Sequence, residues 1–287
     1  MIEGRPSRTA LTVATRRAIH QLVDRPLVFD DPLALRILGP DGEARARAAV
    51  SGAAQSRFGR TLRTFLVVRS RLAEELLADA VRAGATQYVV LGAGLDTFAY
   101  RNPFPQLRVF EIDFPSTQAW KRELLDRTGI GVPANVTFAP CDFARESAAD
   151  ALRRAGIDES KPVFCSWLGV SMYLRREAIL ETVRAMLPLV RGSGGMVFDY
   201  FAPASTLPFV SRILYSIIAP AFRRRVARAG EPFLSSWIPA DLAAALVEAG
   251  ARDVVNHSPR ELANRYLTGR TDGLRMGPAG HIVAFRG

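Results

Sequence analysis

The sequence predicts an α/β fold in which helices cover both faces of a mostly parallel, doubly wound sheet. Short apolar segments alternate with longer amphipathic segments along most of the chain, as expected when strands and helices follow one another. The first strongly apolar run, 88–91, leads directly into a glycine-rich turn, Gly92-Ala93-Gly94. The 287 residues, of which 48% are hydrophobic, are enough to bury one large core.

Residues 1–60 are predicted to form a helical N-terminal extension. Two stretches within them, 9–23 and 43–58, are rich in Ala and Arg and have helical spacing without a strand signal. A third helix is expected over residues 64–83, because apolar side chains recur there at steps of three and four and Gly84 can end the helix. This helix leads into the opening strand.

The main domain is predicted to span residues 61–287 and to alternate strands with helices. The expected strands are 88–91, 108–113, 136–143, 163–170, 194–201, 252–257 and 281–286, and the expected helices are 116–128, 145–155, 175–190 and 239–249. An insertion at 203–238, rich in Phe, Leu, Ile and Arg, is too long for an ordinary loop in a compact domain. We interpret it as a lid; the alternative is a pair of core helices that contacts no substrate.

Composition argues against nucleic acid, metal and membrane as partners. The formal net charge is +10, but the arginines that set it are spread along the chain without a nucleic-acid-binding motif. Cys141 and Cys165 lie apart in apolar runs, which predicts buried thiols in a reducing cytosol and no metal site. Because no apolar window is long enough for a membrane span and no export signal is recognisable, we expect a cytoplasmic protein.

The glycine turn is predicted to hold a cofactor without phosphates. Dinucleotide binding requires a third glycine where this chain has Thr97, and the carboxylate of Asp96 would repel a pyrophosphate. Asp113 ends the second expected strand, where an acid can accept hydrogen bonds from both hydroxyls of a ribose. Asp113 could instead be a helix N-cap, and Glu111, on the same face, competes with it for the ribose.

The third expected strand adds an acid and an aromatic ring for a purine. Asp142 can accept from an exocyclic amine, and Phe143 offers a face to the ring system. Together with the phosphate-averse turn, they describe a site for an adenosine that bears a sulfonium, which is S-adenosylmethionine. The carboxylate of that cofactor needs a cation, and Arg69 or Arg71, on the helix before the first strand, can supply it.

Three segments, YVVLGAGLDTFAYR, FEIDFPSTQAWK and WLGVSMYL, resemble the leucine carboxyl methyltransferase superfamily. The similarity is to its bacterial branch of small-molecule O-methyltransferases, related to polyketide-tailoring enzymes, and it covers roughly residues 60–287. The resemblance implies a class I methyltransferase fold, Rossmann-like, with a seven-stranded sheet whose last strand is antiparallel and a helical cap over the substrate. In many bacterial relatives an acid precedes the glycine after the fourth strand, where this chain has Leu168.

The resemblance and the local chemistry together predict the cofactor-binding residues. Ser166, Trp167 and Leu168 are expected as backbone or packing contacts to the methionine end, and Asp96 and Arg101 are expected to form an ion pair that shapes the turn. The predicted cofactor site consists of Arg69, Gly92, Ala93, Gly94, Asp96, Asp113, Phe114, Asp142, Phe143, Ser166, Trp167 and Leu168.

The methyl acceptor and the catalytic residues are less well specified by the sequence. Tyr173, Asp199 and Tyr200 follow the fourth or fifth strand and are candidates for the base that a hydroxyl acceptor would need. The chain is thus interpreted as an S-adenosylmethionine-dependent O-methyltransferase of secondary metabolism, acting on a hydroxyl or carboxylate of a small aromatic or polyketide-like molecule. The alternatives are a protein carboxyl methyltransferase and a non-catalytic, cofactor-binding regulatory protein. The oligomeric state stays open.

Overall fold

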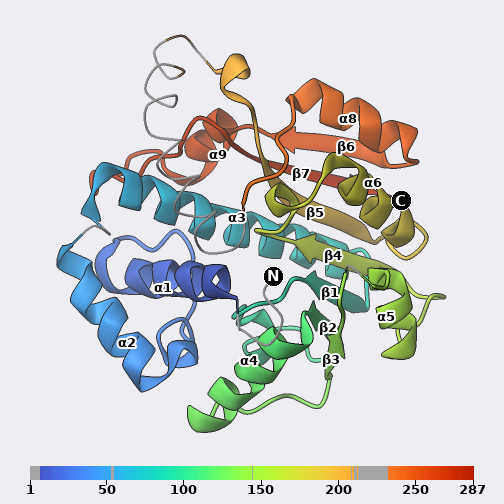
Figure 1. The fold of residues 1–287 in the computed structure, drawn as a ribbon, viewed down its shortest axis with the longest axis horizontal. Helices are drawn as coiled ribbons and strands as arrows, with labels where there is room; N and C mark the ends of the chain where they lie inside the picture. Colours follow the sequence, from blue (N-terminus) through green and yellow to red (C-terminus); the bar gives the residue numbers. More distant parts are fainter. Residues whose placement is uncertain (1–6, 53–54, 144, 208, 210–211, 213–231) are drawn as a thin grey trace.

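Seven strands form one sheet with the order β3-β2-β1-β4-β5-β7-β6 (Figure 1). The computed structural model describes residues 7–52, 55–143, 145–207, 209, 212 and 232–287. Only β7 runs antiparallel to its neighbours. The class I methyltransferase fold is therefore confirmed. The strands are β1 (Gln87–Leu91), β2 (Arg108–Asp113), β3 (Val136–Pro140), β4 (Val163–Trp167), β5 (Gly195–Phe201), β6 (Arg252–His257) and β7 (Gly280–Arg286).

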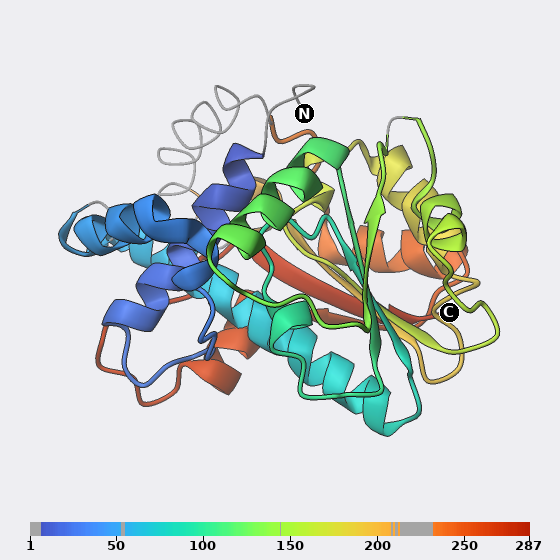
Figure 2. The ribbon, with the colours of Figure 1, turned by 90° about the horizontal axis from the view of Figure 1, so that it is seen from below.

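Helices cover both faces of this sheet. Val89 and Leu91 of β1 pack in one core with α5, α6 and α8, whereas Tyr88 and Val90 pack in a second core with α3 and α9. Alternate side chains of a strand point to opposite faces, so β1 contributes to both cores. Figure 2 shows the sheet between these layers. The helices are α1 (Arg8–Val23), α2 (Gly39–Ala48), α3 (Arg57–Arg82), α4 (Pro115–Arg127), α5 (Ala148–Arg154), α6 (Arg176–Met186), α8 (Pro239–Glu248) and α9 (Pro259–Tyr266).

Two helix predictions near the N-terminus need correction. The helix expected over 43–58 is instead α2, which begins earlier and is followed by a 3-10 turn that ends at Ser51. Ser56 accepts a hydrogen bond from the backbone of Gly59 and so caps a new helix, α3, which starts before the expected residue 64. Helix α9 was not predicted, although Ser258 and Glu261 form a capping box that the sequence displays.

The N-terminal helices pack against the main domain through a buried polar cluster. Asp24, at the end of α1, accepts hydrogen bonds from Arg63 Nε at 2.7 Å and Nη2 at 2.8 Å, and from His20 Nδ1 at 2.7 Å. Because His20 Nε2 accepts from the backbone N–H groups of Val28 and Phe29, the proton of the ring lies on Nδ1. This cluster fixes α1 on α3.

The predicted lid lies largely outside the described residues. Of the range 203–238, residues 208, 210–211 and 213–231 are not described, so the lid and the division into 1–60 and 61–287 stay predictions. Among the described residues, no helix combines the length and the apolar character needed to cross a bilayer.

Candidate functional site

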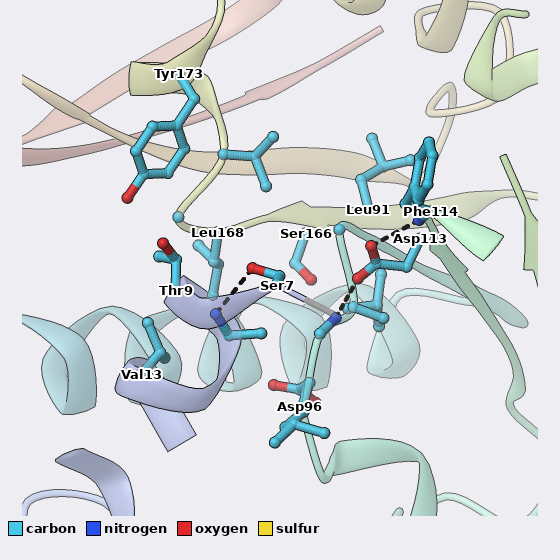
Figure 3. Close-up of a pocket in the computed structure, with 18 of the residues that line it drawn as sticks. Ser7, Thr9, Val13, Leu91, Asp96, Asp113, Phe114, Ser166, Leu168 and Tyr173 are labelled. Atoms are coloured by element: carbon cyan, nitrogen blue, oxygen red, sulfur yellow. Dashed lines mark hydrogen bonds between the residues drawn. The ribbon is translucent and has the colours of Figure 1, made fainter. Parts of the chain in front are cut away.

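A cavity of about 610 Å³ opens at the carboxyl ends of the central strands (Figure 3). Eleven of the twelve predicted cofactor residues line it; Trp167 is the exception. Ligands of open α/β sheets bind at this edge, where strands on either side of the sheet's centre lead into loops that diverge. Here β1 and β4 are the neighbouring strands whose loops diverge.

The turn after β1 requires glycine at two positions, Gly92 and Gly94. Gly92 has φ +69°, and a Cβ built on it would lie 2.5 Å from a methyl carbon of Val170. Gly94 has φ +46°, and its Cβ would lie 3.1 Å from Cβ of Ala10. Left-handed backbone combined with close packing requires glycine at both positions, so the backbone itself forms the floor of the cavity.

Asp113 joins the end of β2 to the glycine turn. Its Oδ2 accepts from the backbone N–H of Gly94 at 2.5 Å, and its Oδ1 accepts from the N–H of Phe114 at 2.7 Å. The N-cap position of α4 is Phe114, without a side-chain cap, so the alternative role of Asp113 as N-cap is wrong. A carboxylate at the end of this strand is of the type that accepts hydrogen bonds from the hydroxyls of a ribose.

Glu111, the competing ribose candidate, lies away from the cavity. Its side chain is fully buried, receives hydrogen bonds from Lys121 and Tyr100, and does not line the cavity. Burial raises the pKa of Glu111, and the neighbouring Lys121 counteracts this. Glu111 therefore acts as the structural counter-charge of Lys121.

Asp96 is paired with Arg17 rather than with Arg101. Arg17 donates to Asp96 Oδ2 at 3.2 Å and to the carbonyl of Leu95 at 2.8 Å, whereas Arg101 binds both carboxylate oxygens of Glu74. The expected ion pair between Asp96 and Arg101 is thus wrong as a direct contact. Burial raises the pKa of Asp96, but the positive charge of Arg17, followed by Lys121 and Arg101, outweighs burial and holds that pKa below its usual value.

Helix α1 forms a wall of the cavity that the sequence did not predict. Six of its residues or neighbours line the cavity, namely Ser7, Thr9, Ala10, Val13, Ala14 and Arg17. One signal was available: helical spacing places Arg17 beside Ala14 and Ala18, on the face of α1 that is buried, and a buried guanidinium needs an acidic partner.

Arg69 is the cation that lines the methionine side of the predicted site. Its Nη1 donates to Asp199 at 2.6 Å, and its guanidinium lies against the backbone of Gly169. Arg71, the other candidate, instead donates to Glu75 and to the carbonyl of Val28 and does not line the cavity.

The adenine candidates Asp142 and Phe143 line the cavity beside Arg145, which forms an ion pair with Asp142 at 3.4 Å. They follow β3, next to the carboxyl end of β2. Asp113, Asp142 and the ring of Phe143 thus lie at the carboxyl ends of the neighbouring strands β2 and β3, as expected.

Of the three catalytic candidates, only Tyr173 lines the cavity. Its ring packs against Phe233 with centroids 5.3 Å apart, and Figure 3 shows its phenol oxygen directed from the short 3-10 helix at Ser171–Tyr173 towards the α1 side. Asp199 accepts a hydrogen bond from Arg69, which separates it from the cavity. Tyr200 donates to Asn256 and stacks on His281. Trp167 is 2% exposed and packs edge-on against Phe198, so it supports the site from the core.

A family model and two related proteins point to the same family of methyltransferases. Residues 10–187 match the model of the leucine carboxyl methyltransferases. YktD of Bacillus subtilis (strain 168), provisionally named an S-adenosyl-L-methionine-dependent methyltransferase, is 28% identical over 99% of this chain and 98% of its own length. A protein of Mycobacteroides abscessus with the same provisional name is 35% identical over 62% of this chain and 60% of its own.

Solved structures share the fold at low identity. A protein from Thermobifida fusca YX, provisionally described as a methyltransferase, has a TM-score of 0.57 and 16% identity over 99% of this chain and 96% of that one. A DUF574-family protein from Streptomyces avermitilis MA-4680 has a TM-score of 0.54 and 16% identity over 88% of this chain and 96% of its own. At this identity the likeness concerns the fold alone.

Proposed function

Because the chain belongs to the leucine carboxyl methyltransferase family and is an S-adenosylmethionine-dependent methyltransferase, we propose that it methylates an oxygen of a small, largely apolar molecule. The observation that carries this proposal is the division of the cavity into two ends. Figure 3 shows Asp113 and Phe114 at one side and Thr9, Val13 and Tyr173 at the other. The first end suits adenosine and the second suits an acceptor.

The side chains of the first end fit the cofactor without conflict. Asp113 would hold the ribose hydroxyls, Asp142 and Phe143 the adenine, and Arg69 the carboxylate of the methionine part. The turn has no side chain at either glycine, so its backbone borders the cavity where a ligand can approach it. The carboxylates of Asp96 and Asp113 border the turn and would repel a phosphate there.

The second end is mostly apolar. Val13 comes from α1, while Leu174 and Leu234 come from the segments that follow β4 and β5. An aromatic or polyketide-like acceptor would bury apolar surface there, and the hydroxyls of Thr9 and Tyr173 could orient its polar atoms. This composition supports a small molecule as the acceptor.

When bound, S-adenosylmethionine would supply the methyl group to the acceptor oxygen and would keep the electron pair of its broken methyl–sulfur bond, leaving as S-adenosylhomocysteine. The protein's task is to align the acceptor and to exclude water. A carboxylate acceptor is already ionised, whereas a hydroxyl must also lose a proton. Tyr173 is the catalytic candidate that lines the cavity and could take that proton.

The proposal is tested by measuring release of S-adenosylhomocysteine with a panel of phenols, aliphatic alcohols and aromatic carboxylic acids. We expect turnover with at least one small phenol or carboxylic acid. Turnover only with a protein's terminal carboxylate would replace the small molecule by a protein acceptor. Tight S-adenosylmethionine binding with no turnover on any acceptor would leave a regulatory, cofactor-binding protein.

The substitution Val13→Trp is expected to block the acceptor end selectively. The added ring overfills a cavity wall, which costs about 1–3 kcal/mol and should lower kcat/KM for the acceptor roughly 5- to 150-fold. Steady-state kinetics measures this effect, and calorimetry should show unchanged S-adenosylhomocysteine affinity. Thr12→Trp is the matched control, because Thr12 is the adjacent residue of α1 and is exposed. If Val13→Trp and Thr12→Trp change kcat/KM equally, α1 does not line the acceptor site.

A further inference from the structure

We infer that Asp199 is a positioning residue that holds Arg69 and the Gly169 backbone in the arrangement that binds the carboxylate of the cofactor. Asp199 lies in the middle of β5 with its side chain completely buried. It does not line the cavity, but both of its partners do. The inference rests on the proposed binding of the cofactor in this cavity.

Both oxygens of Asp199 are used to hold cavity-lining groups. Oδ2 accepts from Arg69 Nη1 at 2.6 Å, and Oδ1 accepts from the backbone N–H of Gly169 at 2.6 Å. One carboxylate therefore ties α3 to the loop after β4, which are 100 residues apart in the sequence. A catalytic base would need an oxygen directed at the substrate, whereas both oxygens of Asp199 accept hydrogen bonds from the protein. The geometry is therefore that of a positioning residue.

Arg69 is held on one side and open on the other. Only its Nη1 has a hydrogen-bonded partner among the described residues, and the side chain is 6% exposed while it lines the cavity. A guanidinium carries five N–H donors in a rigid fork, so one group can bind Asp199 while others bind a second carboxylate. The neighbouring Gly169, with φ +76°, allows this close contact, because a Cβ there would lie 2.7 Å from Nη2.

Two physical effects of Asp199 oppose each other. Its negative charge lowers the positive potential that attracts a ligand carboxylate, which alone would weaken binding. Its hydrogen bond fixes the guanidinium. An amide in its place has one acceptor oxygen for two donors, so its N–H group would face either Arg69 or the N–H of Gly169 and displace that partner. Since both groups are buried and the bond is short, we expect the loss of orientation to dominate.

The test compares two ligands that share the adenosine part. S-adenosylhomocysteine carries the amino-acid carboxylate, and 5′-methylthioadenosine lacks it. Since 5′-methylthioadenosine lacks the whole amino-acid part, the ratio of their dissociation constants, measured by calorimetry, reports the contacts of that part, and its change on substitution of Arg69 reports the carboxylate contact. In the wild type, we expect S-adenosylhomocysteine to bind at least about tenfold more tightly, because a charged hydrogen-bonded pair contributes that much or more.

Asp199→Asn is expected to lose about tenfold of this preference while 5′-methylthioadenosine binds as before. Arg69→Met should lose the part of the preference that the carboxylate contact supplies, and the double variant Arg69→Met/Asp199→Asn should lose no more than Arg69→Met, because Asp199 acts through Arg69. If Asp199→Asn instead raises the preference for S-adenosylhomocysteine, the inference is overturned, because Asp199 would then act only by lowering the positive potential at Arg69.

Further outcomes separate this inference from the proposed function. If the wild type binds neither ligand, the cofactor assignment fails; if it binds both equally, the cofactor stays but the carboxylate contact is overturned. If Asp199→Asn loses 5′-methylthioadenosine as well, its fold is damaged, and Asp199→Glu decides instead. That variant keeps the charge and moves the oxygens by one methylene, so it should lose part of the preference; full retention would contradict a positioning role.

Discussion

Replacing Asp113 by alanine is expected to weaken S-adenosylhomocysteine binding by about 10²–10⁴-fold. In our account the carboxylate accepts two ribose hydroxyls, and each hydrogen bond to a charged group contributes roughly 1.5–3 kcal/mol. The carboxylate also anchors the turn through the N–H of Gly94, so its loss removes both the ligand contact and a turn contact. Calorimetry measures the dissociation constant, and circular dichroism checks the fold.

Two further substitutions separate those contributions. Asp113→Asn keeps the size and one acceptor oxygen, so it can still hold Gly94 but not both hydroxyls, and we expect an intermediate loss. Asp126→Ala removes an exposed acid from the end of α4 and should leave affinity unchanged. If Asp113→Ala binds S-adenosylhomocysteine as tightly as the wild type, the ribose assignment is wrong.

Arg63→Met is expected to destabilise the protein by about 3–5 kcal/mol. Arg63 is fully buried and binds Asp24 through two nitrogens, so its removal leaves a buried carboxylate with only His20 opposite. Urea unfolding followed by circular dichroism measures the loss. On the same helix, Arg82 is largely exposed and paired with Asp79, so Arg82→Met should change stability by less than about 0.5 kcal/mol.

The same cluster predicts the direction of a pH effect. Burial raises the pKa of Asp24, but the hydrogen bonds from His20 and Arg63 outweigh burial and hold that pKa below its usual value of 3.8. A lowered folded-state pKa adds stability above the unfolded-state pKa, and this stability is lost as the pH falls through the folded-state value. The difference between wild type and Arg63→Met should therefore shrink in acid. An unchanged unfolding midpoint for Arg63→Met at neutral pH would contradict the structural role of the cluster.

The sequence predicted those parts of the site that depend on neighbouring strands. The glycine turn, Asp113 and Asp142 each follow a parallel strand, and the carboxyl ends of parallel strands meet at one edge of a sheet. Strand order then places the three side by side without knowledge of any loop. The topology itself came from the resemblance, because alternation of strands and helices leaves the strand order open.

Contacts between distant segments could not be predicted in the same way. Residues of α1 reach the glycine turn because α1 packs on α3 through the cluster of His20, Asp24 and Arg63, which brings together residues far apart in the chain. Arg101 was expected to bind Asp96, its neighbour in the motif, but α3 presents Glu74 to it instead. The pairing of Arg69 with Asp199 likewise depends on how α3 crosses the sheet.

A crystal structure with S-adenosylhomocysteine would show whether the cavity under α1 binds the cofactor through Asp113, Asp142 and Arg69. We expect the ribose hydroxyls on Asp113, the adenine beside Asp142 and Phe143, and the amino-acid carboxylate on Arg69. The sulfur should then face the end of the cavity formed by Val13 and Tyr173. A ligand bound elsewhere, or bound with its ribose away from Asp113, would contradict the account.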